Sequence, residues 1–143
     1  MTSGNNLTRF IEAQNDVYET ALKEIKNGKK TSHWMWYIFP QIKGLGHSEM
    51  ARFYAIQSVD EARTYLHHPV LGKRLVEISS ELLNVTTGDA AAVFGPVDSM
   101  KLRSSMTLFS LLKDAHPVFQ KVLDKFFNGR KDEKTIALID GEN

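Results

Sequence analysis

An aromatic segment with polar neighbours is the part of this sequence best suited to bind or process a ligand. Both tryptophans, one tyrosine and one phenylalanine fall within residues 34–39. Aromatic rings can stack on a planar ligand, and the adjacent cations Lys29 and Lys30 can hold an anion. His33 is the candidate proton shuttle, and Gln41 adds a hydrogen-bonding amide. The alternative is a buried core element, in which the two lysines only complement the negative end of a preceding helix.

A second candidate lies within a helix that the pattern predicts from about Asp98 to Ala115. At 100° per residue, Lys101 and Ser105 lie at the centre of its apolar arc and Ser104 near one edge. The solvent side is then formed by Arg103, Thr107 and Ser110. A lysine in the first turn opposes the positive end of the helix dipole, so we expect an anion or carboxylate beside it, Asp98 being one candidate. The alternative is a lysine stem that passes over the core and a small buried serine.

These two breaks in the hydrophobic pattern are explained together by one concave site. We expect the site to bind an anionic small molecule of nucleotide-like or ADP-ribose-like chemistry, with hydrolysis through His33 as the enzymatic form of the hypothesis. A non-catalytic module that binds an anionic ligand or a protein partner is the alternative, and no sequence feature decides between the two. The predicted site residues are Lys29, Lys30, His33, Trp34, Trp36, Tyr37, Gln41, Gly44, Gly46, Lys101, Ser104 and Ser105.

Other motifs that carry chemistry are absent or incomplete. None of the five histidines forms the i, i+4 pair that places two imidazoles on one helix face, so no metal site is expected. The stretch from Gly44 to Ser48 lacks the third glycine of a dinucleotide-binding fingerprint, and neither a P-loop nor a serine-nucleophile motif occurs, so no cofactor is expected. With 18 lysines and arginines against 17 acidic residues, nucleic acid and anionic membranes are disfavoured as partners.

The elements that must position these residues are predicted to be helices. Apolar residues recur at i, i+3, i+4 and i+7 along several segments, and no alternating strand pattern is present. We therefore expect a mainly α fold: a single compact multi-helix domain over residues 1–143, ordered from about 7 to 139, with the buried aromatic segment 34–39 at its centre. Ser58 and Glu61 form a capping-box motif. The predicted helices cover about residues 8–14, 16–28, 58–67, 69–85, 90–94, 98–115, 117–127 and 132–138.

The absence of cysteine and of long apolar segments bears on the location of the protein. A chain without cysteine has no disulfide and no thiol nucleophile, and it suits a reducing compartment. No apolar run approaches the roughly 18 residues that span a bilayer, and residues 1–7 lack the apolar core of a signal peptide. We expect a cytoplasmic protein with no membrane partner, whose oligomeric state the sequence leaves open.

Several phrases of the sequence match one known family. These phrases are Gly28–Gln41, Gly44–Gly46, Asp60–Ala62, Leu66, His68–Pro69, Leu71–Gly72, Phe94–Gly95 and Lys101–Phe109. Over about residues 7–139 the chain resembles the small bacterial family catalogued as domain of unknown function 1810, some members of which are labelled calpastatin. The resemblance implies a mainly helical single domain without an established activity. Ser58–Leu75 and the later lysine-bearing helix are also similar to all-helical proteins that process ADP-ribose and related N-glycosides, a similarity that transfers no catalytic residue.

Overall fold

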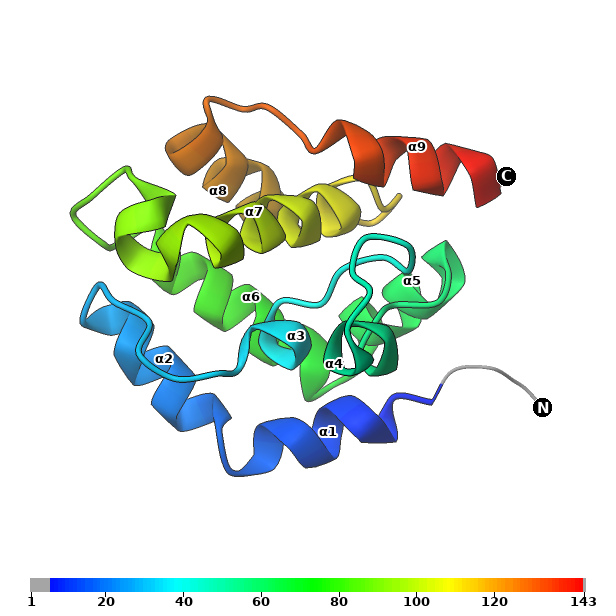
Figure 1. Ribbon diagram of the computed structural model, residues 1–143, viewed down its shortest axis with the longest axis horizontal. Helices are drawn as coiled ribbons and strands as arrows, with labels where there is room; N and C mark the ends of the chain where they lie inside the picture. Colours follow the sequence, from blue (N-terminus) through cyan, green and yellow to red (C-terminus); the bar gives the residue numbers. More distant parts are fainter. Residues whose placement is uncertain (1–5, 143) are drawn as a thin grey trace.

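Helices form the regular secondary structure of residues 6–142, which are the residues that the computed structural model describes (Figure 1). The mainly α fold predicted from the sequence is thus confirmed. Within these residues, the strand-like pairing consists of one isolated bridge between Ile42 and Ile56. The helices are α1 (Thr8–Asn15), α2 (Tyr18–Lys26), α3 (Met35–Ile38), α4 (Glu49–Phe53), α5 (Val59–His67), α6 (Leu71–Leu82), α7 (Ala90–Ser110), α8 (Pro117–Phe127) and α9 (Glu133–Glu142).

The short helix α3 lies at the centre of the molecule, between two groups of helices (Figure 1). Helices α7, α8 and α9 lie above it in this view, and α1 and α2 lie below it. Helix α6 packs against α2, α5 and α8 and so joins the two groups. Trp34 and Phe39, which flank α3, are completely buried. The prediction of a buried aromatic segment at the centre of the fold is confirmed.

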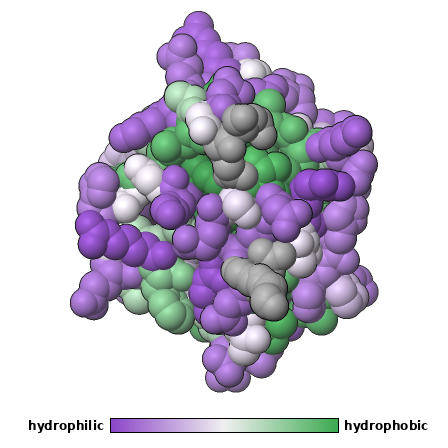
Figure 2. Space-filling view, turned by 90° about the vertical axis from the view of Figure 1, so that its right-hand side faces the viewer, coloured by the Kyte–Doolittle hydropathy of each residue, from purple (hydrophilic) through white to green (hydrophobic). Residues whose placement is uncertain are grey.

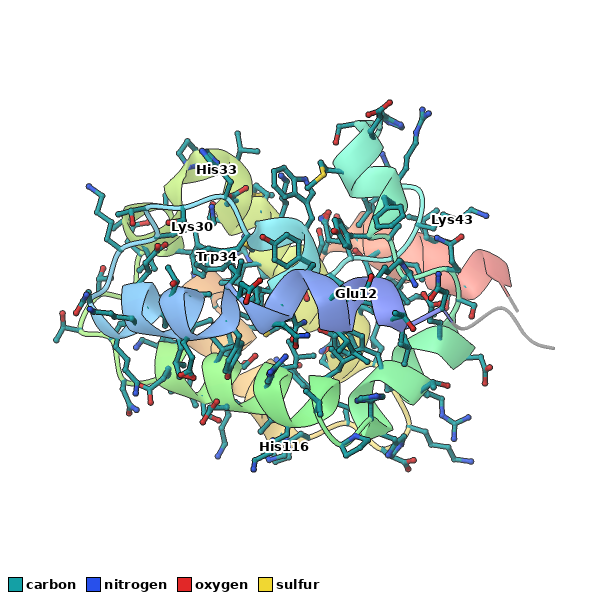
Figure 3. All side chains as sticks on the ribbon, turned by 90° about the horizontal axis from the view of Figure 1, so that it is seen from below. Glu12, Lys30, His33, Trp34, Lys43 and His116 are labelled. Atoms are coloured by element: carbon teal, nitrogen blue, oxygen red, sulfur yellow. The ribbon has the colours of Figure 1, made fainter. Side chains whose placement is uncertain are left out.

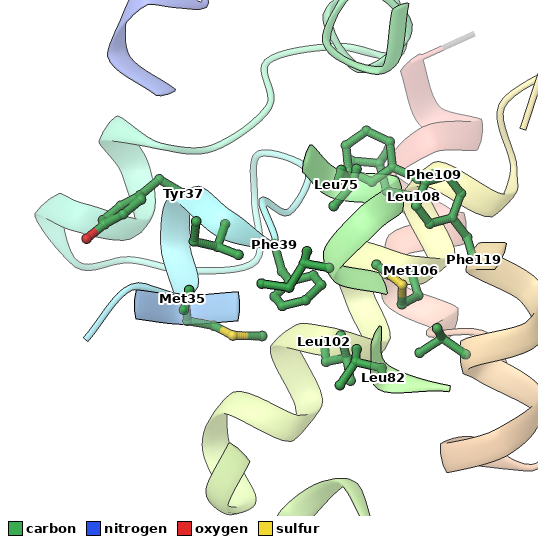
Figure 4. Packing of buried hydrophobic residues seen from close by; sticks show 14 of the residues in the cluster. Met35, Tyr37, Phe39, Leu75, Leu82, Leu102, Met106, Leu108, Phe109 and Phe119 are labelled. Atoms are coloured by element: carbon green, nitrogen blue, oxygen red, sulfur yellow. The ribbon is translucent and has the colours of Figure 1, made fainter. Parts of the chain in front are cut away.

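The side chains of α3 enter a hydrophobic core that continues into α6, α7 and α8. Figure 4 shows Met35 and Phe39 on one side of this core and Phe109 and Phe119 on the other. The ring centroids of Phe109 and Phe119 lie 5.7 Å apart, within the range of favourable aromatic pairs. Because interiors of this kind are close-packed, the backbone of α3 is held in one position. Trp36, on the same short helix, is only partly buried and is left at the surface.

The buried carboxylate of Glu24 on α2 fixes the chain that enters α3. It accepts hydrogen bonds from the Thr31 N–H at 2.7 Å, the Ser32 N–H at 3.0 Å, the Ser32 hydroxyl at 2.6 Å and the Trp34 indole N–H at 2.9 Å. Burial raises the pKa of Glu24, but these hydrogen bonds to the charged form outweigh burial and lower the pKa from 4.5 to about 2. The carboxylate is therefore ionised at neutral pH and provides the partner that a buried indole requires.

Two histidine–proline pairs begin helices by the same hydrogen-bonding arrangement. The Nδ1 atom of His68 accepts from the backbone N–H groups of Val70 and Leu71 at 3.1 and 3.2 Å. The Nδ1 atom of His116 accepts from the Val118 N–H at 3.0 Å. Each imidazole thus satisfies N–H groups that a helix N-terminus leaves without partners. The sequence predicts a break at both pairs, although α6 starts at Leu71 and not at residue 69.

Helix α7 differs in part from the two helices that the sequence predicts for this region. It is kinked at Gly95, whose φ of 83° is outside the helical range, so the predicted division falls at the correct place. The helix ends at Ser110, earlier than residue 115. The sequence predicts a helix that starts at about Asp98, but Asp89 caps the start of α7 and the Asp98 carboxylate forms ion pairs with two lysines. Asp98, one candidate for the expected anionic partner of Lys101, does lie beside it.

Helix α9 covers a side of α7 that the sequence assigns to solvent. Thr107 is fully buried, and its hydroxyl oxygen accepts a hydrogen bond from the Asp132 N–H at 2.8 Å. The Asp132 carboxylate caps α9 by accepting from the Thr135 N–H at 2.9 Å. Arg103 donates to backbone carbonyls in the segment between α8 and α9. The predicted solvent side is therefore wrong at Thr107, because a helix distant in the sequence packs there.

The crossing of α5 and α6 yields a test of packing at Gly72. A Cβ atom at this position would lie 1.8 Å from the Leu66 carbonyl oxygen, far inside van der Waals contact. We expect Gly72→Ala to lower the free energy of unfolding by about 3 kcal/mol, as overpacking of a core does. Gly141→Ala is the matched control, because that helical glycine has no atom within 4 Å of its Cβ position. Urea denaturation measures both variants, and equal stabilities would contradict the close approach.

The Glu24 network makes the stability of the fold depend on pH. Because the pKa of Glu24 is lowered from 4.5 to about 2 in the folded protein, its contribution is fully present above pH 4.5 and is lost as the pH falls towards 2. We expect Glu24→Gln to lower the free energy of unfolding at pH 7 by about 2 to 3 kcal/mol, the value of hydrogen bonds to a charged group. The difference from the native chain should shrink between pH 4.5 and 2. A difference that stays constant over this range would refute the assignment.

Candidate functional site

A cleft of about 360 Å³ opens beside α3, within the size range of small-molecule sites. It is bounded by α3, by the loop that follows α3, by α4 with the chain after it, and by one residue of α7. The lining residues are Met35, Trp36, Phe39, Gln41, Ile42, Lys43, Gly44, Gly46, His47, Ala51, Arg52, Tyr54, Ala55, Gln57 and Lys101.

Two short extended segments, 41–43 and 55–57, form part of the cleft wall. The Ile56 N–H donates to the Gln41 carbonyl and the Lys43 N–H donates to the Ile56 carbonyl, both at 2.8 Å. Side chains alternate along extended chain, and polar residues stand on both sides of the buried Ile42 in the sequence and directly after the buried Ile56. The Gln41, Lys43 and Gln57 side chains consequently belong to the cleft.

A buried ion pair beneath this wall holds the chain that follows α4. The Arg9 guanidinium on α1 donates to the carbonyls of Phe53 and Ala55 and to Glu61 Oε1, each at 2.8 Å. Glu61 Oε1 also accepts from the Gln57 N–H at 3.0 Å, and the Glu61 N–H donates to the Ser58 hydroxyl oxygen. Ser58 thus caps α5 as predicted, while the Glu61 carboxylate binds Arg9. Residues 53–57 are fixed by both partners of the pair.

The opposite side of the cleft is formed by Trp36 and Lys101. The Lys101 ammonium lies 5.1 Å from the centroid of the Trp36 ring and 3.3 Å from Asp98 Oδ1. The second oxygen of Asp98 lies 2.9 Å from the ammonium of Lys30. A cation over an indole face is attracted by its negative quadrupole. Lys101 is thereby held against the aromatic wall.

The charges of the cleft are all of one sign. Lys43, Arg52 and Lys101 contribute cationic groups and His47 contributes an imidazole, whereas no aspartate or glutamate is among the lining residues. Trp36 and Tyr54 supply aromatic surface in the same cleft. A concave site with fixed positive charge and aromatic surface favours an anion that carries a planar ring.

The cleft contains some of the residues that the sequence predicts for a site. Trp36, Gln41, Gly44, Gly46 and Lys101 all line it. These residues come from two segments separated by more than fifty positions in the sequence, and they lie together because α7 packs beside α3.

Other predicted site residues lie in the core or form internal contacts. Trp34 is fully buried with its indole N–H on Glu24. The Tyr37 ring packs on Tyr54, with centroids 5.1 Å apart, and burial raises the pKa of its phenol. Lys30 forms its ion pair beneath the surface. None of the three lines the cleft.

The predicted residues Ser104, Ser105, Lys29 and His33 also lie outside the cleft. The Ser104 hydroxyl bonds to the Met100 carbonyl at 3.1 Å. Ser105 is completely buried, and its hydroxyl has no hydrogen-bond partner in the described part of the chain. Lys29 and His33 are exposed, and Figure 3 shows His33 well apart from Lys43 of the cleft wall.

Most charged groups in the cleft are absent from the site residues that the sequence predicts. Lys43 and His47 flank the two glycines that were selected, so neighbourhood in the sequence was a usable signal for them. Arg52, Tyr54 and Gln57 belong to no motif. They reach the cleft because Arg9 and Glu61 hold the chain after α4 in place.

Helix α9 supports the loop at the cleft. A Cβ atom on Gly44 would lie 3.1 Å from the Leu138 side chain, and Gly44 has a φ of 109° that side chains rarely allow. Ile42 and Lys43 also border a shallow hollow with Ala137 and Leu138. This face of the molecule is mostly hydrophilic and is interrupted by hydrophobic surface (Figure 2). Glycine at position 44 lets α9 pack directly on the loop.

Residues 6–142 also bear on metal binding and on membrane insertion. No group of three or more histidine, aspartate or glutamate side chains in this range is placed to hold a metal ion. None of the helices described here is long and apolar enough to cross a membrane.

Comparisons with known proteins define the class of this protein. The sequence model of the family described as Protein of unknown function (DUF1810) matches residues 4–139, and the chain belongs to this family. The crystal structure of the conserved hypothetical protein Rv1873 from Mycobacterium tuberculosis is similar over 95% of this chain and 97% of that chain, with 43% sequence identity and a TM-score of 0.93. No curated protein matches the chain. The family resemblance predicted from the sequence is confirmed.

The buried pair beneath the cleft wall predicts a large effect of Arg9→Met. This change leaves the Glu61 carboxylate buried without a charged partner, which we expect to cost about 3 to 5 kcal/mol of stability. The double variant Arg9→Met/Glu61→Leu should recover part of the loss, because it removes the unpaired charge. Arg63→Met on the exposed side of α5 is the control, with a change within about 0.5 kcal/mol. Chemical denaturation that found Arg9→Met as stable as Arg63→Met would disprove the role of the pair.

Proposed function

We propose that the cleft beside α3 binds an anionic small molecule that carries a planar ring, of nucleotide-like or ADP-ribose-like chemistry. The observation that carries the proposal is the composition of the lining: three cationic side chains and no carboxylate, next to two aromatic side chains. The whole chain has a net charge of only +1, so an overall excess of cations does not account for this lining. The positive charge is local to the cleft.

The ring and the anionic group of the ligand have separate partners in this proposal. Trp36 is partly exposed in the cleft and offers its indole for stacking, which is worth about 1 to 3 kcal/mol per base. Lys101, Lys43 and Arg52 provide the donors for phosphate oxygens, and charge-assisted bonds of this kind are about twice as strong as neutral ones. The amides of Gln41 and Gln57 can donate to and accept from polar edges of a ring.

Binding without turnover is the form of the proposal that the cleft favours. His33, the residue proposed from the sequence as a proton shuttle, does not line the cleft, and neither does any carboxylate. His47 contributes the imidazole among the lining residues. A hydrolytic step in this cleft would therefore have to use His47, and the proposal assigns no proton transfer to His33.

Calorimetric titration of the protein with 5′-AMP, ADP-ribose, adenosine and inorganic phosphate tests this function. We expect AMP and ADP-ribose to bind more tightly than adenosine or phosphate, because only they engage both the aromatic and the cationic groups. Trp36→Leu should weaken AMP binding about tenfold, the value of one stacked base. Phe53→Leu is the matched control, because Phe53 is exposed on α4 and does not line the cleft.

Lys101→Met separates binding from stability in the same experiment. The methionine keeps the apolar stem against Trp36, and Asp98 keeps Lys30 as its partner, so we expect the melting temperature to change little. AMP binding should weaken about tenfold through loss of a charge-assisted hydrogen bond. A variant that loses stability but binds AMP as tightly as the native chain would make Lys101 a structural ion-pair partner and contradict the proposal.

A further inference from the structure

We propose that Lys30, which does not touch the cleft, is a positioning residue that neutralises Asp98 and so leaves the positive charge of Lys101 available to an anionic ligand. The inference rests on the function proposed above and deepens it. It assigns a role to Lys30, which the sequence predicts as a site residue but which does not line the cleft.

The two ion pairs of Asp98 differ in length and in exposure to solvent. Its Oδ2 atom lies 2.9 Å from the Lys30 ammonium, whereas its Oδ1 atom lies 3.3 Å from the Lys101 ammonium. The Lys30 side chain is 7% exposed and the Lys101 side chain is 26% exposed. An ion pair that is shorter and shielded from water is the stronger of the two. Asp98 is therefore chiefly the partner of Lys30.

The rest of the surroundings hold Lys30 in place. Its ammonium donates to the Ser32 carbonyl at 2.5 Å and lies 5.0 Å from the centroid of the Trp34 ring. Its backbone N–H donates to the Val93 carbonyl at 2.8 Å. Both Ser32 and Trp34 are themselves bound to the Glu24 carboxylate. Lys30 cannot leave this arrangement without exposing several partners. Among residues 6–142, the charged and aromatic partners of the Lys101 ammonium are Asp98 and the Trp36 ring.

The charges of Lys30, Asp98 and Lys101 together determine the net charge on this side of the cleft. Two ammonium groups and one carboxylate sum to one positive charge, and the cation nearest the cleft is Lys101. Without Lys30, Lys101 and Asp98 would form an isolated pair of zero net charge, one helical turn apart on α7. An incoming anion would then have to compete with Asp98 for Lys101. Lys30 removes that competition from outside the cleft.

The test measures the affinity for 5′-AMP of the native chain and of three variants. We expect Lys30→Met to weaken AMP binding about threefold to fivefold, the scale of one partly exposed ion pair, although Lys30 touches no ligand. Asp98→Asn should tighten binding by a similar factor, because it frees Lys101 and removes a negative charge. The double variant Lys30→Met/Asp98→Asn should bind at least as tightly as the native chain, because it has no carboxylate left to neutralise.

A role of Lys30 in folding alone predicts a different pattern. The methionine would then weaken binding by loosening the segment around Trp34, and Asp98→Asn would not restore it. Thermal unfolding of every variant identifies any loss of fold, and Asp98→Asn alone tests the inference if Lys30→Met fails to fold. Lys29→Met is the control for charge, because Lys29 is exposed and outside the cleft.

The outcomes separate this inference from the proposed function. If AMP binding depends on Trp36 and Lys101 but is unchanged in Lys30→Met, or stays weak in the double variant, the role of Lys30 is rejected and the binding function stands. If Asp98→Asn does not tighten AMP binding, the inference is likewise rejected. If the native chain binds neither AMP nor ADP-ribose, both the function and the role of Lys30 are rejected.

Discussion

The ionised carboxylate of Glu24 is the interaction on which the centre of this fold depends. Four hydrogen bonds from Thr31, Ser32 and Trp34 converge on it and fix the chain between α2 and α3. Trp34 is thereby anchored in the core, and α3 starts at the next residue. Because α3 has only a single turn, its orientation is set by its ends more than by its own hydrogen bonds. The position of Trp36 at the surface follows from that anchor.

The same backbone segments serve the core and the cleft. In α3, Met35 and Ile38 are buried while Trp36 is partly exposed, and in the paired extended segments Ile42 and Ile56 are buried beside polar neighbours that line the cleft. Trp36, Gln41, Lys43 and Gln57 in the cleft are therefore each next to a residue that is fixed by close packing. This arrangement pre-organises the cleft, which reduces the ordering cost of binding.

Internal pairing of carboxylates explains how a nearly neutral chain obtains a cationic cleft. Glu24 is surrounded by hydrogen-bond donors, Glu61 is paired with Arg9, and Asp98 is shared by two lysines. Each of these acids lies near the cleft or its supporting chain, yet none lines it. The cations Lys43 and Arg52 have no such internal acid among the ion pairs of residues 6–142. The sign of the cleft therefore results from where the acids are placed, not from their number.

Local patterns in the sequence determined the helices other than α3 and α4, several of their caps and the buried aromatic segment. Ser58, His68, His116 and Gly95 each act through hydrogen bonds or dihedral angles within a few residues, so their effects are visible in the sequence. The cleft residues Trp36, Gln41 and Lys101 could be selected because they interrupt an apolar pattern.

Tertiary structure alone decided which of those residues share a site. Trp34 and Trp36 are indistinguishable by type and surroundings in the sequence, and only the contact with Glu24 buries one and leaves the other in the cleft. Arg52, Tyr54 and Gln57 reach the cleft through Arg9, which is more than forty residues away, and Thr107 is buried only because α9 returns to cover it. A helical wheel records the periodicity of one element, whereas burial depends on the partner that packs against it, and that partner is set by contacts between residues distant in the chain.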